Sequence, residues 1–178
     1  EAFEERTVIV EDTTPPALDL VGDATVKVEC GGAFDEPGVT AVDACDGDLT
    51  GSIVVGGDTV DTNTPGEYTV VYNVSDSAGN AAPSVTRDVI VADTQTPVIT
   101  LLGGNPMTLE CGGTFTDPGA EAIDNVDGDL SGDIVASGSV DASTPDTYIL
   151  TYTVSDAAGN EAFEERTVIV EDTTPPAL

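Results

Sequence analysis

The 178-residue chain contains no histidine and no tryptophan, and only four of its residues are basic. Without histidine, no Ser–His or Cys–His pair can activate a nucleophile, so we expect no enzymatic activity. The 34 acidic residues give a formal net charge of −30, which excludes binding to nucleic acid phosphates and to anionic membranes. No apolar run approaches the roughly 18 residues of a membrane-spanning helix, and no signal-peptide pattern is present.

The sequence pattern predicts mainly short strands and turns. The 39% hydrophobic content allows a packed core, and the 19 glycines and 11 prolines suit frequent turns. Apolar residues alternate with polar ones over residues 26–30, 68–74, 107–111 and 148–154, which is typical of half-buried strands. About seven such strands in about 80 residues favour an all-β fold of immunoglobulin-like β-sandwiches.

The sequence repeats itself on two scales. Residues 1–18 are identical to residues 161–178, a period of 161 − 1 = 160 residues. A looser repeat lies inside this period, because residues 28–54 match residues 109–135 at an offset of 109 − 28 = 81. A repeat of this length is typical of a modular array, so we interpret the chain as two tandem modules in an extended rod.

The module boundaries are expected at the Asp-Thr-x-x-Pro segments, where proline fixes φ and removes a backbone donor. These segments are predicted to be short, stiff linkers between modules. The resulting division is residues 1–12 as the last strand of a preceding repeat, 13–93 as module 1, 94–172 as module 2, and 173–178 as the start of the next repeat.

Four motifs occur together in this order. They are ECGGxFxDPG, DGDL, TPGxYxVxYxVSDxAGN and DTTPP. The departures are Cys45, which has Val126 opposite it in the second module, and Pro145-Asp146 in place of Pro65-Gly66. The combination resembles the bacterial immunoglobulin-like repeats of large surface adhesins, with related modules in HYR-type proteins and pesticidal crystal toxins. The resemblance implies an extracellular β-sandwich array and leaves the ligand open.

Carboxylates are concentrated in glycine-containing loops and in the linkers. Clustered hard oxygen donors suit calcium, which takes six to eight oxygens, whereas the alternative is that they are ordinary turn formers on a solvated surface. We expect calcium at one or more of three sets: Asp43, Asp46, Asp48 with Asp124, Asp127, Asp129 in the Asp-rich loops; Asp76, Asn80 with Asp156, Asn160 before the last strands; and Asp12, Asp93, Asp172 in the linkers.

The direction of the strands decides which of these sets meet. If seven strands alternate in direction, the Asp-rich loop lies where the chain leaves its module, and the loop before the last strand lies where it enters. The junction would then gather Asp46, Asp48 and Asp93 with Asp156 and Asn160 of the next module. This arrangement is similar to that of cadherins, in which calcium stiffens a string of sandwiches.

The three cysteines lead to two expectations. An acidic surface protein is located in an oxidising environment, where disulfides persist, so we expect a bridge between Cys30 and Cys45. Simple strand counting, however, puts these two residues at opposite ends of the module. Bridging requires Cα atoms within about 7 Å. Cys111 has no partner in its module and is expected to pack as a small apolar residue, with an intermolecular bridge as the alternative.

These observations favour a structural repeat of an extracellular fibre or giant surface adhesin, stiffened by calcium. Its expected partners are neighbouring copies in a linear array or filament, joined covalently or by donation of residues 2–11 as a strand. The alternative is a carbohydrate- or protein-binding module, for which Phe34 and Phe115 are candidate surface aromatics. The sequence leaves this choice open.

Overall fold

The computed structural model describes residues 3–176 and divides the chain into two compact units, Glu1–Ala92 and Asp93–Leu178. Within the described residues, each unit has seven β-strands and one short 3₁₀ turn. Unit 1 contains β1 (Ala17–Leu20), β2 (Thr25–Glu29), β3 (Val39–Asp43), β4 (Gly47–Asp48), η1 (Thr50–Ser52), β5 (Val54–Gly57), β6 (Gly66–Asn73) and β7 (Val85–Ala92). Unit 2 contains β8 (Val98–Leu101), β9 (Met107–Glu110), β10 (Ala120–Asp124), β11 (Gly128–Asp129), η2 (Ser131–Asp133), β12 (Val135–Ser137), β13 (Asp146–Ser155) and β14 (Glu161–Glu171).

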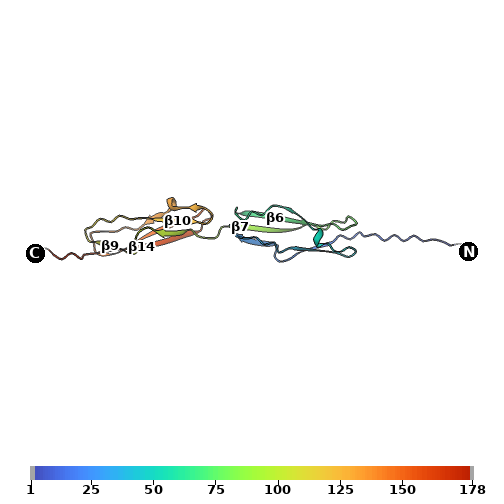
Figure 1. Cartoon of the computed structure of the whole chain (residues 1–178), viewed down its shortest axis with the longest axis horizontal. Helices are drawn as coiled ribbons and strands as arrows, with labels where there is room; N and C mark the ends of the chain where they lie inside the picture. The colour runs from blue at the N-terminus through green and yellow to red at the C-terminus, as the bar shows by residue number, and fades with distance from the viewer. Residues whose placement is uncertain (1–2, 177–178) are drawn as a thin grey trace. The chain divides into compact units, whose positions relative to one another are not determined.

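Each unit is built from two sheets (Figure 1). Unit 1 pairs a three-stranded sheet, β1-β3-β4, with a four-stranded sheet, β2-β7-β6-β5, and unit 2 repeats this order as β8-β10-β11 and β9-β14-β13-β12. The predicted all-β fold of immunoglobulin-like sandwiches is confirmed. The helical segments found in residues 3–176 are the two three-residue 3₁₀ turns, neither of which could span a bilayer.

The strands do not alternate strictly in direction, which corrects the expectation above. β1 is antiparallel to β3 in one sheet, while β2 is parallel to β7 in the other. The loop before β7 lies beside the segment before β1, because the side-chain amide of Asn80 donates to the carbonyl of Asp12 at 3.1 Å. Since β2 is parallel to β7, the chain keeps its direction as it passes from β1 to β2 and changes sheets there without turning back. The turn between β3 and β4 and the loop between β6 and β7 consequently lie together at the end where β1 begins, which we call the N-terminal pole of the unit; the opposite end is the C-terminal pole.

The core follows the alternation seen in the sequence. Tyr72 and Val74 in unit 1, and Tyr152 and Val154 in unit 2, are buried, as are alternate residues of β7 and β14. Val168 in β14 is completely buried. Burial of apolar surface at these positions is the main source of stability.

Arg166 is a fully buried arginine near the middle of β14. Its guanidinium donates to the backbone carbonyls of Leu102 (2.6 Å), Gly104 (2.7 Å) and Gly119 (2.9 Å), and it lies 3.5 Å from a carboxylate oxygen of Asp117. Since a buried charge is tolerated only when it is paired and hydrogen-bonded, these carbonyls fix the segments around β8, β9 and β10 against β14.

Arg87 has the same role in unit 1. It is fully buried in β7 and donates to the carbonyl oxygens of Val21 (2.9 Å) and Gly38 (3.1 Å) and to the carboxylate of Glu36 (2.9 Å). Alternation of apolar residues gives no signal for a buried arginine, so the burial of these two residues was not predicted from the sequence. Both basic groups are fully engaged away from the N-terminal pole.

Replacing Arg166 with methionine is expected to lower the free energy of unfolding of unit 2 by about 3 kcal/mol, because the carbonyls and the carboxylate lose their donor. Arg6 occupies the same place in the identical segment at residues 1–18 but is exposed, so Arg6→Met is the matched control. It should change stability by less than about 0.5 kcal/mol. Urea unfolding followed by circular dichroism checks both values, and equal losses in the two variants would contradict this role.

Candidate metal centre

The loops at the N-terminal pole of unit 2 gather three carboxylates. Oxygens of Asp93, Asp127 and Asp156 all lie within 4.8 Å of one another. Asp93 belongs to the linker that leads into the unit, Asp127 to the turn between β10 and β11, and Asp156 to the loop between β13 and β14. Asp93 is 9% exposed and Asp156 is 7% exposed, so two of the three charges have little water to screen them.

Hydrogen bonds hold these three segments together. Asp127 Oδ2 accepts from the backbone N–H of Ala157 at 2.7 Å, and the side-chain amide of Asn160 donates to the carbonyl of Asp93 at 3.3 Å. Asn160 also donates to both carboxylate oxygens of Asp156, through its backbone N–H (2.7 Å) and its amide (2.8 Å). The site is therefore built mainly by contacts among its own loops.

The pKa of Asp156 is lowered. Burial acts to raise the pKa of this carboxyl, but the side chain and backbone of Asn160 and the backbone N–H groups of Gly159 and Ala158 outweigh burial. The group is consequently ionised at neutral pH, as a cation ligand must be. The basic side chains described in unit 2 offer it no partner, because Arg166 is committed to its carbonyls and Asp117.

Unit 1 has a related but different cluster. A carboxylate oxygen of Asp12, one of Asp43 and the sulfur of Cys45 lie within 4.8 Å of one another. The negative charge of Asp12 is the main cause that raises the pKa of the Cys45 thiol, so Cys45 is a neutral thiol at pH 7. Asp46, which corresponds to Asp127, instead accepts the backbone N–H of Ser77 (2.6 Å) and its hydroxyl (2.9 Å) on its two oxygens.

Asp43 and Asp124 each leave one buried oxygen without a partner. Asp43 Oδ1 accepts the N–H groups of Cys45 (2.7 Å) and Asp46 (2.9 Å), and the N–H of Asp46, followed by that of Cys45, lowers the pKa of Asp43. Its Oδ2 is buried and has no hydrogen bond, and the same is true of Oδ2 of Asp124. The two residues are 5% and 4% exposed. A buried, unpartnered carboxylate oxygen is costly, and a cation would satisfy it.

Three other predicted ligands have partners outside the two clusters. Asp48 and Asp129 accept the N–H groups of Thr50 (2.9 Å) and Ser131 (3.0 Å) and so begin the 3₁₀ turns. Asp172 follows β14 and accepts the N–H of Thr174 at 3.1 Å. Among the described residues, these three do not join either cluster.

The expected grouping of Asp46 and Asp48 with Asp93 is wrong. Asp46 contacts Ser77 in the β6–β7 loop of its own unit, at the pole where that unit begins. The reason is the change of sheet between β1 and β2, which turns the Asp-rich loop to the N-terminal pole. Asp93 does join Asp156, as expected, and it does so with Asp127 of its own unit.

The predicted bridge between Cys30 and Cys45 is also wrong, because the two thiols are not joined. Cys30 follows β2 and donates its backbone N–H to Ala92 at the end of β7 (2.9 Å), whereas Cys45 lies at the N-terminal pole. The two residues are thus at opposite ends of the unit. Cys111 is half-buried, and its thiol donates to the carbonyl of Ser143 at 3.2 Å.

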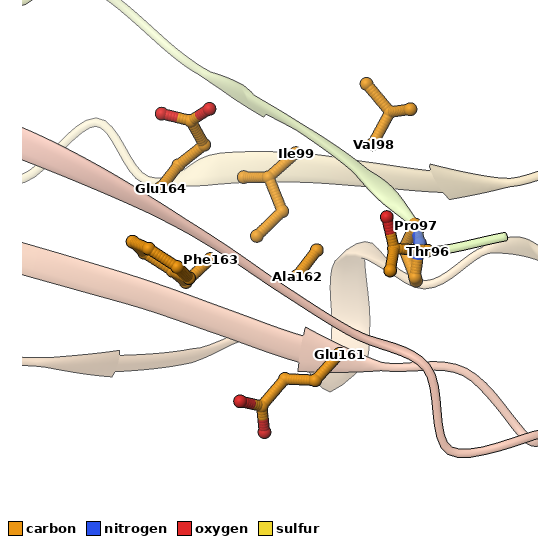
Figure 2. Close-up of a pocket in the computed structure, with 8 residues that line it drawn as sticks. All are labelled: Thr96, Pro97, Val98, Ile99, Glu161, Ala162, Phe163 and Glu164. Carbon is orange, nitrogen blue, oxygen red and sulfur yellow. The ribbon is translucent and has the colours of Figure 1, made fainter.

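A shallow hollow of about 350 Å³ lies on unit 2 beside the beginnings of β8 and β14 (Figure 2). Figure 2 shows Phe163 and Ile99 along it, with Glu161 and Glu164 on opposite sides in this view. Phe163 is 66% exposed. The candidate aromatics Phe34 and Phe115 are half-buried, so Phe163 is more accessible than either of them.

The linker after unit 2 is anchored to the unit it leaves. The carboxylate of Glu110, at the end of β9, accepts the backbone N–H and the hydroxyl of Thr173 (3.0 and 2.5 Å) and of Thr174 (3.2 and 2.7 Å). The hydroxyls of Thr173 and Thr174 lower the pKa of Glu110. These bonds restrain the Asp-Thr-Thr segment at its start.

Comparisons with known proteins agree with the fold. The family model described as "Bacterial surface protein, Ig-like domain" matches residues 18–91 and 99–170. Pesticidal crystal protein Cry22Aa of Bacillus thuringiensis is 32% identical over 156 residues, covering 82% of this chain and 21% of its own length. Hyalin of Strongylocentrotus purpuratus is 32% identical over 193 residues, covering 96% of this chain and 15% of its own length.

A lipoprotein of Bacteroides thetaiotaomicron aligns in structure with a TM-score of 0.41 and 22% identity, covering 85% of this chain and 98% of that chain. The family matches confirm the resemblance drawn from the sequence motifs. The chain spans about a fifth or less of the length of the two sequence relatives named above.

Replacing Glu110 with glutamine should lower the melting temperature at pH 7, because one amide oxygen cannot serve the donors that two carboxylate oxygens accept. A lowered folded-state pKa contributes stability above the unfolded pKa of about 4.3 and loses it as the pH falls through the folded value. The difference from the wild type should therefore shrink between pH 5 and about pH 3. Thermal melts in EGTA measure it, with Glu121→Gln, an exposed site on β10, as the control. A difference that stays constant with pH would contradict the anchor.

Proposed function

The chain belongs to the family of bacterial surface Ig-like domains, and on that premise we propose that it is a structural unit of an extracellular array whose linkers are stiffened by calcium. The family identifies a cell-surface module. The array and the calcium are the proposal, and both rest on how the linker residues are held. No enzymatic role is proposed.

The observation that carries the calcium proposal is the meeting of Asp93, Asp127 and Asp156 within 4.8 Å. Three like charges at this separation repel, and two of them are less than one-tenth exposed. A divalent cation with oxygen ligands removes that repulsion, and calcium accepts carboxylates, backbone carbonyls and waters in flexible geometry. The buried oxygen of Asp124, in the same turn as Asp127, has no hydrogen-bond partner and is a further group that a cation would stabilise.

Unit 2 is the stronger of the two sites in this proposal. Asp127 uses one oxygen for Ala157, and its Oδ1 has no donor among the described residues, whereas both oxygens of Asp46 serve Ser77. Unit 1 also presents the neutral thiol of Cys45 where unit 2 has Val126. Because calcium prefers hard oxygen ligands, we expect unit 1 to bind it more weakly.

A cation at this site would tie the incoming linker to its unit. Asp93 is the linker residue of the cluster, and its carbonyl already accepts from Asn160. At the other pole, Glu110 holds the outgoing segment through Thr173 and Thr174. Linkers restrained at both poles support a role in spacing and orienting modules along an array.

The relatives support a module that is used in different contexts. One relative is named as a pesticidal crystal protein and the other as hyalin, and they come from a bacterium and a sea urchin. A module shared by such different proteins suits a structural role better than a single catalytic or ligand-binding activity. The alternative, an adhesive module, is favoured only by the exposed Phe163 in its acidic hollow.

Calcium should raise the melting temperature of the full chain relative to EGTA. A ligand present at 100 times its Kd adds about 2.7 kcal/mol to the folded state, which corresponds to roughly 10 °C or more for a unit of this size. Asp127→Asn should abolish most of this shift for unit 2, because the exposed oxygen that completes the cluster becomes part of a neutral amide.

Asp129→Asn is the matched control, since it removes the same charge from the same loop but lies outside the cluster. It should retain the full calcium shift, and magnesium should produce a smaller one because it demands stricter octahedral geometry. If calcium leaves the melting temperature unchanged, or if the two variants respond alike, the calcium proposal is wrong.

A further inference from the structure

The first residues of β14 have an open edge. On one side, β13 pairs with β14 along nearly its whole length, whereas on the other side β9 pairs with it only from Val168 onward. Ahead of β9, the side-chain amide of Asn105 donates to the carbonyl of Glu165 (2.9 Å) and accepts the N–H of Thr167 (2.9 Å). The first four residues of β14 therefore present an edge that no described strand covers.

Strand geometry gives the direction of the backbone groups on this edge. The N–H and C=O of one residue in a strand point to the same side, and successive residues alternate between the two sides. Because Glu165 and Thr167 face the side of Asn105, the backbone groups of Phe163 face that side as well. The ladder to β13 does not use them, so they are open to pairing with another extended backbone.

The side chains along this edge alternate in character. Glu161, Phe163 and Glu165 share the outer face of the sheet, because alternate positions such as Arg166 are buried on the inner face. All three side chains are exposed, and neither carboxylate joins an ion pair among the described residues. The row therefore presents an aromatic ring between two unpaired negative charges.

The hollow of about 350 Å³ lies beside the same edge. It is bounded by the beginnings of β8 and β14, and Ile99 and Ala162 lie across it from one another (Figure 2). β8 is itself at the edge of its sheet, and Val98 at the rim of the hollow is 68% exposed. A strand added to β14 would direct its alternate side chains into this hollow, which suits small apolar groups.

Unit 1 lacks a corresponding site. Counted from Asn80 and Asn160, Pro83 stands where unit 2 has Phe163. Proline has no N–H to donate to an added strand and is typical of protected edges, and β7 begins only at Val85. Of the two described units, only unit 2 offers this edge.

Charge decides which kind of strand can bind here. An extended peptide backbone matches the open backbone groups, but another copy of this chain, at a net charge of −30, would bring acidic surface against the acidic row. A partner of opposite charge is favoured instead.

We propose that residues 161–165 bind an extended basic peptide segment of a partner protein, paired antiparallel to β14. Lysine or arginine would lie opposite Glu161 and Glu165, and an aromatic or β-branched residue would lie opposite Phe163. Small apolar residues between them would enter the hollow beside Ile99. The inference goes beyond the proposed function, and it depends on neither the array nor calcium.

The test titrates the full chain, in EGTA, into a fluorescent peptide of sequence Thr-Lys-Val-Tyr-Val-Lys-Thr and follows the fluorescence anisotropy. A salt concentration of about 0.15 M screens long-range attraction. We expect saturable 1:1 binding. Replacing both lysines of the peptide with glutamate, or methylating the backbone nitrogen of its central tyrosine, should each weaken binding by about tenfold or more.

Two variants of the chain test the edge and the charged row separately. Phe163→Pro removes the open N–H without touching the ladder to β13, and it should weaken binding by about tenfold while the melting transition is retained. The double variant Glu161→Lys, Glu165→Lys does not depend on how well proline is tolerated. It should bind the glutamate peptide more tightly than the lysine peptide, although the chain as a whole stays strongly acidic.

The matched control carries Glu67→Lys and Glu121→Lys, which change the net charge equally at exposed positions away from the hollow. It should keep the preference of the wild type for the lysine peptide. The proposal is overturned if the control and the Glu161, Glu165 variant respond alike, or if the N-methylated peptide binds as well as its parent. It is also overturned if the wild type does not bind the lysine peptide, because the carboxylates then only protect the edge from pairing.

Discussion

Repulsion among carboxylates constrains this chain more than any other interaction. It carries 34 acidic residues against four basic ones, and the two arginines in the sandwiches are buried and held by carbonyls and by Glu36 and Asp117. Neither of these arginines is therefore available to the poles, where linker and loop carboxylates meet. The proposed calcium would supply positive charge there, because it suits the oxygen donors that are present.

Much of the fold was predictable because strand alternation and repeats are local signals. Alternating residues such as Tyr72 and Val74 marked buried strand faces, and the repeated motifs marked two modules. Which loops lie at which pole was not predictable, because nothing in the residues between β1 and β2 shows that the chain changes sheets without reversing direction. That single feature moved Asp46 to the opposite pole from the one expected.

The sequence predicted which types of residue form the candidate site, but it did not predict which of them lie together. Asp93, Asp127 and Asp156 were each expected as ligands, and the structure brings them together within one unit. Asp48 and Asp129 are also aspartates of the Asp-rich loops, yet each accepts the N–H group that begins a 3₁₀ turn. Such a difference depends on backbone geometry of the loop, which spacing alone does not encode.

The most direct measurement is a crystal structure of the full chain grown with calcium, with anomalous scattering used to locate the ion. The calcium proposal predicts an anomalous peak at the N-terminal pole of unit 2, coordinated by carboxylate oxygens of Asp93, Asp127 and Asp156, and a weaker peak or none in unit 1. A structure in which these three carboxylates hold only water, while calcium binds elsewhere or nowhere, would contradict it.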